Sequence, residues 1–188
     1  MAVERAKRQF TVADYYRMAE AGILTEDDRV ELIEGEIVEM PPIGDRHASC
    51  VDRTTVLFAR LFGGRAHLRI QNPLRSSNRS EPVPDLMLLR PRPDFYASGH
   101  PTPSDVLLLV EVSDSSEAYD RRVTLPLYAR EGVQEVWIFD LGRSVVRVHR
   151  EPSPTGYALV ATHRRGERIA PAAFPDIAIR VEEVIGPA

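Results

Sequence analysis

The fold is decided by two apolar runs that each carry an acid: Val83-Pro84-Asp85-Leu86-Met87-Leu88-Leu89 and Val106-Leu107-Leu108-Leu109-Val110-Glu111. Short, continuous apolar runs of this kind are typical of strands buried on both faces. Asp85 and Glu111 are therefore expected where a sheet reaches its rim. Two acids brought together there make a site for a hard cation, and such a site can drive phosphodiester hydrolysis.

The chain before these runs predicts two helices, a hairpin and a strand. Thr11 can cap a helix that ends near Ala21, and Asp45 can cap another that runs from about residue 47 to 62. Residues 29–40 read as a hairpin because Glu34-Gly35 separates two strand-like runs. A strand is expected over residues 66–71.

The chain after Leu89 alternates loops with further strands. Residues 91–104 contain four prolines and predict a surface loop. Residues 119–131 have a helical pattern that Pro126 interrupts, so either Thr124 caps a short helix or one longer helix bends there. Residues 134–150 predict a hairpin, with 144–150 as a surface strand, and residues 157–162 a further strand.

These elements predict an α/β (α+β) domain with a mixed central sheet flanked by helices and with hairpin additions. We expect this single domain to span residues 10–188, after a disordered N-terminus over residues 1–9.

Composition limits the function classes. The formal net charge is −4 with one lysine, Lys7, and one cysteine, Cys50, among 188 residues. The acidic balance is unlike that of a strong nucleic-acid binder, although arginines cluster locally. A lone cysteine excludes an intrachain disulfide and a cysteine-based zinc site, and we interpret Cys50 as a small buried residue. With no signal peptide and no apolar span visible, the expected location is the cytoplasm, with no membrane partner.

Other candidate residues are less distinctive than the two acids. Glu31 is a candidate third acid, although an exposed hairpin residue is the more usual interpretation and Glu34, Glu36 and Glu39 compete with it. His47, near a helix start, can orient water or touch a phosphate, whereas a solvent-exposed histidine is more usual there. Even for Asp85 and Glu111, ordinary strand-end acids paired with arginine are an equal alternative on pattern alone.

An ordered series of motifs resembles the Uma-type putative restriction endonuclease family, a branch of the PD-(D/E)XK nuclease superfamily. The similarity covers roughly residues 10–185 and rests on 31–40 (ELIEGEIVEM), His47, Pro84-Asp85, 111–116 (EVSDSS), Tyr119-Asp120-Arg121 and 127–140 (LYAREGVQEVWIFD).

The resemblance implies a restriction-endonuclease-like core and a metal-dependent endonuclease whose partner is nucleic acid, with DNA favoured over RNA and the choice between them left open by the sequence. Asp85, Glu111 and the carbonyl of Val112 would hold Mg²⁺ or Mn²⁺, with Glu31 completing the catalytic site and His47 nearby. The resemblance also makes a homodimer reasonable, for which the 91–104 loop and the 144–150 strand are candidate contacts.

The departure from the family pattern is the lysine. The residue two after the glutamate is Ser113, and the position implied on the following helix is Thr124. A neutral hydroxyl cannot replace a cation, and Arg121 or Arg122 can supply charge but not act as a base. The alternative hypothesis is therefore a degenerate nuclease fold that binds nucleic acid or a protein partner without cutting. A third hypothesis, an unrelated scaffold, predicts that Asp85→Ala stabilises the fold by relieving acid repulsion.

Overall fold

A six-stranded mixed sheet forms the centre of the computed structural model, which describes residues 8–25, 27–114 and 123–186. The strands, in their order across the sheet, are β3 (His67–Ile70), β4 (Leu86–Leu89), β5 (Val106–Ser113), β6 (Glu135–Asp140), β7 (Val145–Ser153) and β8 (Gly156–Arg164). Within the described residues, β5 and β6 are the only parallel neighbours in this sheet, and the other neighbours are antiparallel. The predicted mixed sheet, the two buried apolar strands and the 134–150 hairpin are confirmed.

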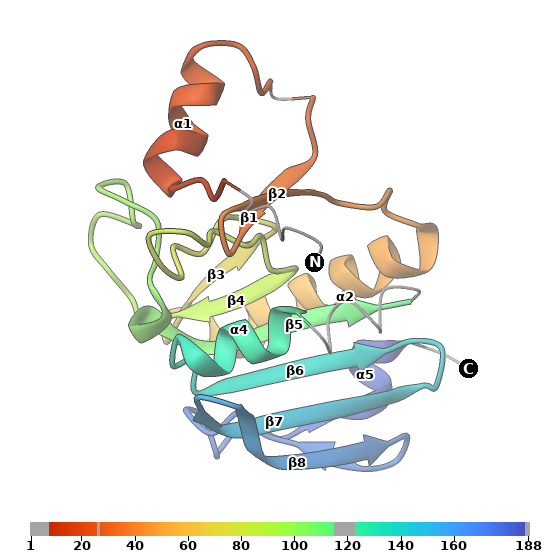
Figure 1. Cartoon of the computed structure of the whole chain (residues 1–188). Helices are drawn as coiled ribbons and strands as arrows, with labels where there is room; N and C mark the ends of the chain where they lie inside the picture. Colours follow the sequence, from red (N-terminus) through yellow and green to blue (C-terminus); the bar gives the residue numbers. More distant parts are fainter. Residues whose placement is uncertain (1–7, 26, 115–122, 187–188) are drawn as a thin grey trace.

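Helices cover both faces of this sheet (Figure 1). α2 (Asp45–Phe62) and α5 (Val181–Ile185) pack on one face, and α4 (Leu125–Arg130) on the other. Side chains alternate along each strand, so Leu86 and Leu88 enter the α2 core while Met87 and Leu89 enter the α4 core. This two-sided burial explains why β4 and the first five residues of β5 are all apolar.

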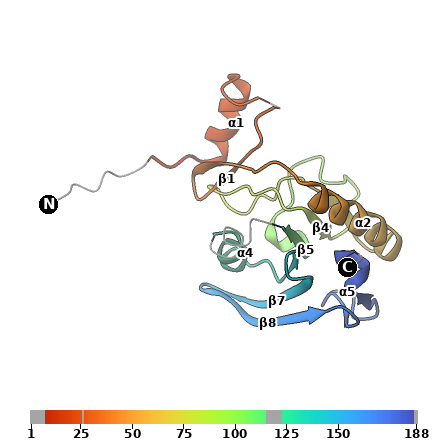
Figure 2. The same ribbon diagram turned by 90° about the vertical axis from the view of Figure 1, so that its right-hand side faces the viewer.

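The N-terminal part forms a separate layer (Figures 1 and 2). α1 (Val12–Glu20) begins at Thr11, whose side chain makes the predicted cap, and β1 (Val30–Ile33) pairs with β2 (Glu36–Glu39). The turn between them needs left-handed backbone at both central residues, Glu34 and Gly35. A side chain at Gly35 would also clash, because an added Cβ there would lie 2.7 Å from the Cβ of Gln9. This hairpin is tied to the main body because the Glu81 N–H donates to the Leu32 carbonyl at 2.7 Å.

The remaining elements are short. η1 (Pro103–Asp105) ends the proline-rich 91–104 loop, and β9 (Arg168–Ile169) pairs with β10 (Ile179–Arg180) just before α5. No helix in the described ranges is long and apolar enough to cross a membrane.

Three local expectations need correction or narrowing. Gly44, not Asp45, is the N-cap of α2, and Asp45 is its first helical residue, where its charge suits the helix dipole. The 144–150 segment is not a surface strand, because β8 pairs along its outer side. Thr124 precedes the short helix α4 with helical backbone and no side-chain cap bond. Most of the 1–9 segment, together with Arg121 and Arg122, lies outside the described residues.

Candidate active site

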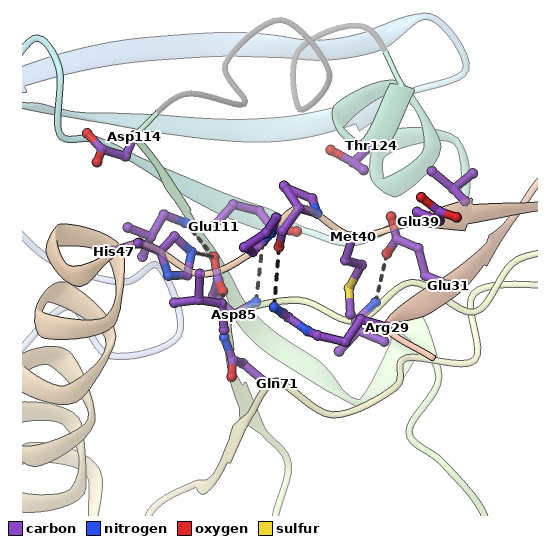
Figure 3. A pocket seen from close by; sticks show the side chains of 17 residues that line it. Arg29, Glu31, Glu39, Met40, His47, Gln71, Asp85, Glu111, Asp114 and Thr124 are labelled. Carbon is purple, nitrogen blue, oxygen red and sulfur yellow. Dashed lines mark hydrogen bonds and ion pairs between the residues drawn. The ribbon is translucent and has the colours of Figure 1, made fainter. Parts of the chain in front are cut away.

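Strand register brings the two predicted acids together. β4 and β5 are antiparallel with Leu86 opposite Val110, so the next step along the pair places Asp85 beside Glu111. The Asp85 main-chain N–H donates to Glu111 Oε2 at 3.3 Å. Two acids that are far apart in the sequence therefore share one corner of the sheet (Figure 3).

Asp85 is fixed by groups from three separate elements. The Val112 N–H donates to Asp85 Oδ2 at 2.8 Å, and His47 Nε2 lies 3.0 Å from the same oxygen. Gln71, which follows β3, donates from Nε2 to Asp85 Oδ1 at 3.4 Å. The Asp85 side chain is only 13% exposed, so these bonds replace much of the hydration of its carboxylate and set its orientation.

Glu111 has its own anchor on the opposite face of the sheet. The Tyr128 hydroxyl, on α4, donates to Glu111 Oε1 at 2.7 Å. Glu111 is thus held through both oxygens, one by the Asp85 main chain and one by the Tyr128 phenol. The arrangement positions Glu111 toward the rim rather than leaving it to rotate in solvent.

Both acids open into a cavity of about 560 Å³ between the hairpin and the sheet rim (Figure 3). Glu31 also lines this cavity and is buried, and its Oε2 accepts the Val83 N–H at 3.2 Å. Among the competing hairpin acids, Glu39 lines the cavity, whereas Glu34 is exposed and pairs with Arg130 at 2.7 Å. The structure therefore brings Glu31 and Glu39 to the site.

The remaining predicted site residues also reach the cavity. His47, Val112 and Thr124 all line it. Thr124 is buried at the start of α4 and lines the same cavity as Glu31 and Glu39 (Figure 3). The whole predicted set, Asp85, Glu111, Glu31, His47, Val112 and Thr124, thus converges on one hollow.

Sequence reasoning missed Arg29, Gln71 and Tyr128. Among the described residues that line the cavity, Arg29 is the only lysine or arginine, and its Nη1 donates to the Pro41 carbonyl at 3.3 Å. The sequence signal for Arg29 is its position directly before the first strand of the hairpin, which also carries Glu31. Nothing local in the sequence marks Gln71 or Tyr128, because their partners become neighbours only through the sheet and α4.

Cys50 is not part of this chemistry. Cys50 lies on α2 with its side chain buried in the core, and its Sγ donates to the Val184 carbonyl at 3.3 Å. Burial raises the pKa of the Cys50 thiol to about 11. A thiol with so little thiolate at neutral pH is a poor nucleophile, which confirms its interpretation as a core residue.

The donor set suits a hard cation held in part by water. In the described part of the chain, no group of three or more histidine, cysteine, aspartate or glutamate side chains is arranged to hold a metal ion. Mg²⁺ is nevertheless commonly bound through only one or two carboxylates while it keeps several waters. Asp85 and Glu111, adjacent and oriented, fit that requirement.

Comparison with known proteins gives two findings. Residues 12–182 match the model of Uma2, a family described as "Putative restriction endonuclease". The fold resembles the crystal structure of "a putative nuclease belonging to DUF820" from Anabaena variabilis ATCC 29413, with a TM-score of 0.69 and 14% identity. That alignment covers 94% of this chain and 97% of the other, and at this identity it shows the shared fold alone. The comparison with curated proteins gave no significant match.

Proposed function

Because this chain belongs to the Uma2 family of putative restriction endonucleases, we propose that it is a metal-dependent endonuclease that hydrolyses phosphodiester bonds in DNA. The observation that carries the proposal is the pairing of Asp85 with Glu111 at the sheet rim, inside a cavity that also contains Glu31 and His47. DNA is preferred to RNA because the family is described as a restriction endonuclease.

The carboxylates of Asp85 and Glu111, with the carbonyl of Val112, would hold Mg²⁺ or Mn²⁺. Such an ion lowers the pKa of bound water and neutralises charge on a reacting phosphate. The groups around the two acids hold both carboxylates in fixed orientations. His47, Gln71 and the Val112 N–H orient Asp85, and Tyr128 orients Glu111.

Glu31 is the best placed hairpin acid for proton transfer. It is buried, lines the cavity and keeps one oxygen engaged with the Val83 N–H. A carboxylate in this position can accept a proton from an attacking water or orient that water.

The missing lysine lowers the expected rate. Thr124 offers only a hydroxyl at the implied position, so its side chain cannot stabilise developing negative charge as an ammonium would. Arg29 enters the same cavity and supplies a permanent positive charge, although arginine cannot act as a base. Loss of one preorganised electrostatic group typically costs about 10²–10³ in rate, so we expect a slow enzyme.

The second candidate function is binding without cleavage. It is favoured by the neutral Thr124 and by the hydrogen bonds of Asp85, which give that acid a structural role independent of any reaction. In either case a homodimer is part of the proposal, and the measured molar mass of the native protein would test it.

The deciding experiment is a cleavage assay on supercoiled DNA, single-stranded DNA and RNA in Mg²⁺ or Mn²⁺. Wild type is compared with Asp85→Ala, Arg29→Gln and Thr124→Lys, and Glu31→Gln is matched by Glu36→Gln, which alters an exposed acid outside the cavity. Slow cleavage by wild type that Asp85→Ala abolishes supports the enzyme. Cleavage only by Thr124→Lys indicates an intact metal site in an inactive natural protein. No cleavage by any variant favours the binding function.

A further inference from the structure

A second hollow lies beside the candidate active site. It has a volume of about 420 Å³ and is bounded by the first turns of α2, the β6–β7 turn, the turn after β8 and the end of α5. Its lining residues, which we call the arginine depression, are Asp45, Arg46, Ser49, Arg53, Leu141, Ser144, Arg165 and Ile185.

The two hollows share one helical turn. Gly44 and His47 face the acid cavity, whereas Asp45 and Arg46 face the arginine depression. Asp114, which also lines the acid cavity, forms an ion pair with Arg46 Nη1 at 2.7 Å. The arginine depression therefore adjoins the acid cavity across the first turn of α2.

The depression concentrates positive charge in a chain whose formal net charge is −4. It contains three arginines against one aspartate, and the first turn of α2 adds the positive end of an 18-residue helix. Arg46 is partly neutralised by Asp114, and its Nη2 also donates to the Leu141 carbonyl at 2.9 Å.

The other two arginines keep their charge available. Arg53 donates to two neutral oxygens, Ser49 Oγ at 3.2 Å and the Val184 carbonyl at 3.4 Å. Within the described ranges, the Arg165 side chain makes no hydrogen bond or ion pair, and it influences Glu182 only through space. Glu182 is itself engaged by the Gly166 N–H at 2.9 Å.

This composition fits a phosphate group. Guanidinium groups bind phosphate through parallel N–H donors, and the hydroxyls of Ser49 and Ser144 add neutral donors on the same surface. We propose that the arginine depression binds a backbone phosphate of the DNA strand, beside the phosphate that reacts at Asp85 and Glu111. The inference rests on the proposed function, and it adds the positioning subsite for the substrate backbone.

Arg165→Gln tests the proposal, and Arg164→Gln is the matched control. Arg164 is the preceding residue, it is exposed and outside the depression, and its replacement removes the same charge. The affinity for a short fluorescein-labelled duplex is measured by anisotropy over a range of salt concentrations, with EDTA present so that no cleavage occurs.

One lost phosphate contact should reduce the slope of log K against log salt by about 0.9, which corresponds to about eightfold weaker binding at 0.1 M salt. We expect this change for Arg165→Gln but not for Arg164→Gln. Equal effects of the two variants would overturn the proposal, because they would show only a general charge effect.

A second measurement locates the contact on the DNA. Neutral methylphosphonate linkages are placed at one position at a time, and wild type should lose affinity at a position beside the reacting phosphate. Arg165→Gln should be insensitive there; equal sensitivity of both proteins at every position would also overturn the inference. Because the readout is metal-free binding, failure of DNA cleavage would refute the proposed enzyme without deciding this subsite.

Discussion

Replacing Asp85 by alanine and by asparagine should separate two opposing effects of this acid on the metal-free protein. Alanine removes the charge and also the acceptor of the Val112 N–H, which lies 2.8 Å from Asp85 Oδ2 in a buried segment. Asparagine removes the charge but keeps a carbonyl oxygen of similar reach. If repulsion between the acids dominates, both variants should be more stable than wild type. If hydrogen bonding dominates, only Asp85→Ala should be less stable than wild type.

The structure favours hydrogen bonding as the larger effect. Glu111 is already stabilised by the Asp85 N–H and the Tyr128 hydroxyl. Removing the repulsion between the two carboxylates should therefore add little to the stability of the protein. Leaving a buried donor unsatisfied costs about 1–3 kcal/mol. At roughly 2–4 °C per kcal/mol for a protein of this size, Asp85→Ala should melt about 2–12 °C below wild type, and Asp85→Asn should lie close to wild type.

Metal should then separate wild type from the asparagine variant. A ligand that binds only the native state at ten times its Kd adds about 1.4 kcal/mol to the unfolding free energy. We therefore expect Mg²⁺ or Mn²⁺ to raise the melting temperature of wild type by about 3–6 °C and to leave both variants unchanged. Differential scanning calorimetry measures the melting temperatures of the three proteins, each with metal and with EDTA. A metal-free Asp85→Ala protein more stable than wild type would refute the reasoning, and so would a wild type that ignores metal.

Three further outcomes follow from particular contacts. Tyr128→Phe should lower the unfolding free energy in urea by about 0.5–1.5 kcal/mol and slow any cleavage, because the bond to Glu111 is lost; unchanged cleavage would argue against a positioning role. Cys50, with a pKa of about 11, should react with iodoacetamide at pH 8 far more slowly in the native than in the urea-unfolded protein, as mass spectrometry would show. Burial and the carboxylate of Glu81 raise the pKa of Tyr16 to about 12. The contribution of Tyr16 to the unfolding free energy should therefore be complete below pH 10 and disappear as the pH rises toward 12. The test is the difference in unfolding free energy between wild type and Tyr16→Phe, measured as a function of pH; a midpoint near pH 10 would contradict the prediction.

Local patterns predicted most of the framework. The alternation of turn residues and apolar runs located the β1–β2 hairpin, and the unbroken apolar composition of the β4 and β5 runs identified strands covered on both faces. The same patterns placed Asp85 and Glu111 at strand ends, and antiparallel pairing then brought them together.

Features set by distant neighbours were beyond such patterns. The 144–150 segment alternates like a surface strand, yet β8 pairs along its outer side. Gln71 and Tyr128 carry no local signal, because their bonds to the acids depend on how β3 and α4 pack. Among the hairpin acids, Glu31 was distinguished from Glu34 and Glu36 only when burial and the bond to Val83 were known.

The three anchors of Asp85 have a consequence for what the presence of this acid says about function. An acid that joins the start of α2, the residue after β3 and the Val112 main chain helps to hold the fold together as well as to serve a reaction. Loss of any catalytic role would not release Asp85 from this structural role, because its replacement would still leave buried partners without their acceptor. The presence of this aspartate is therefore evidence of folding as much as of catalysis.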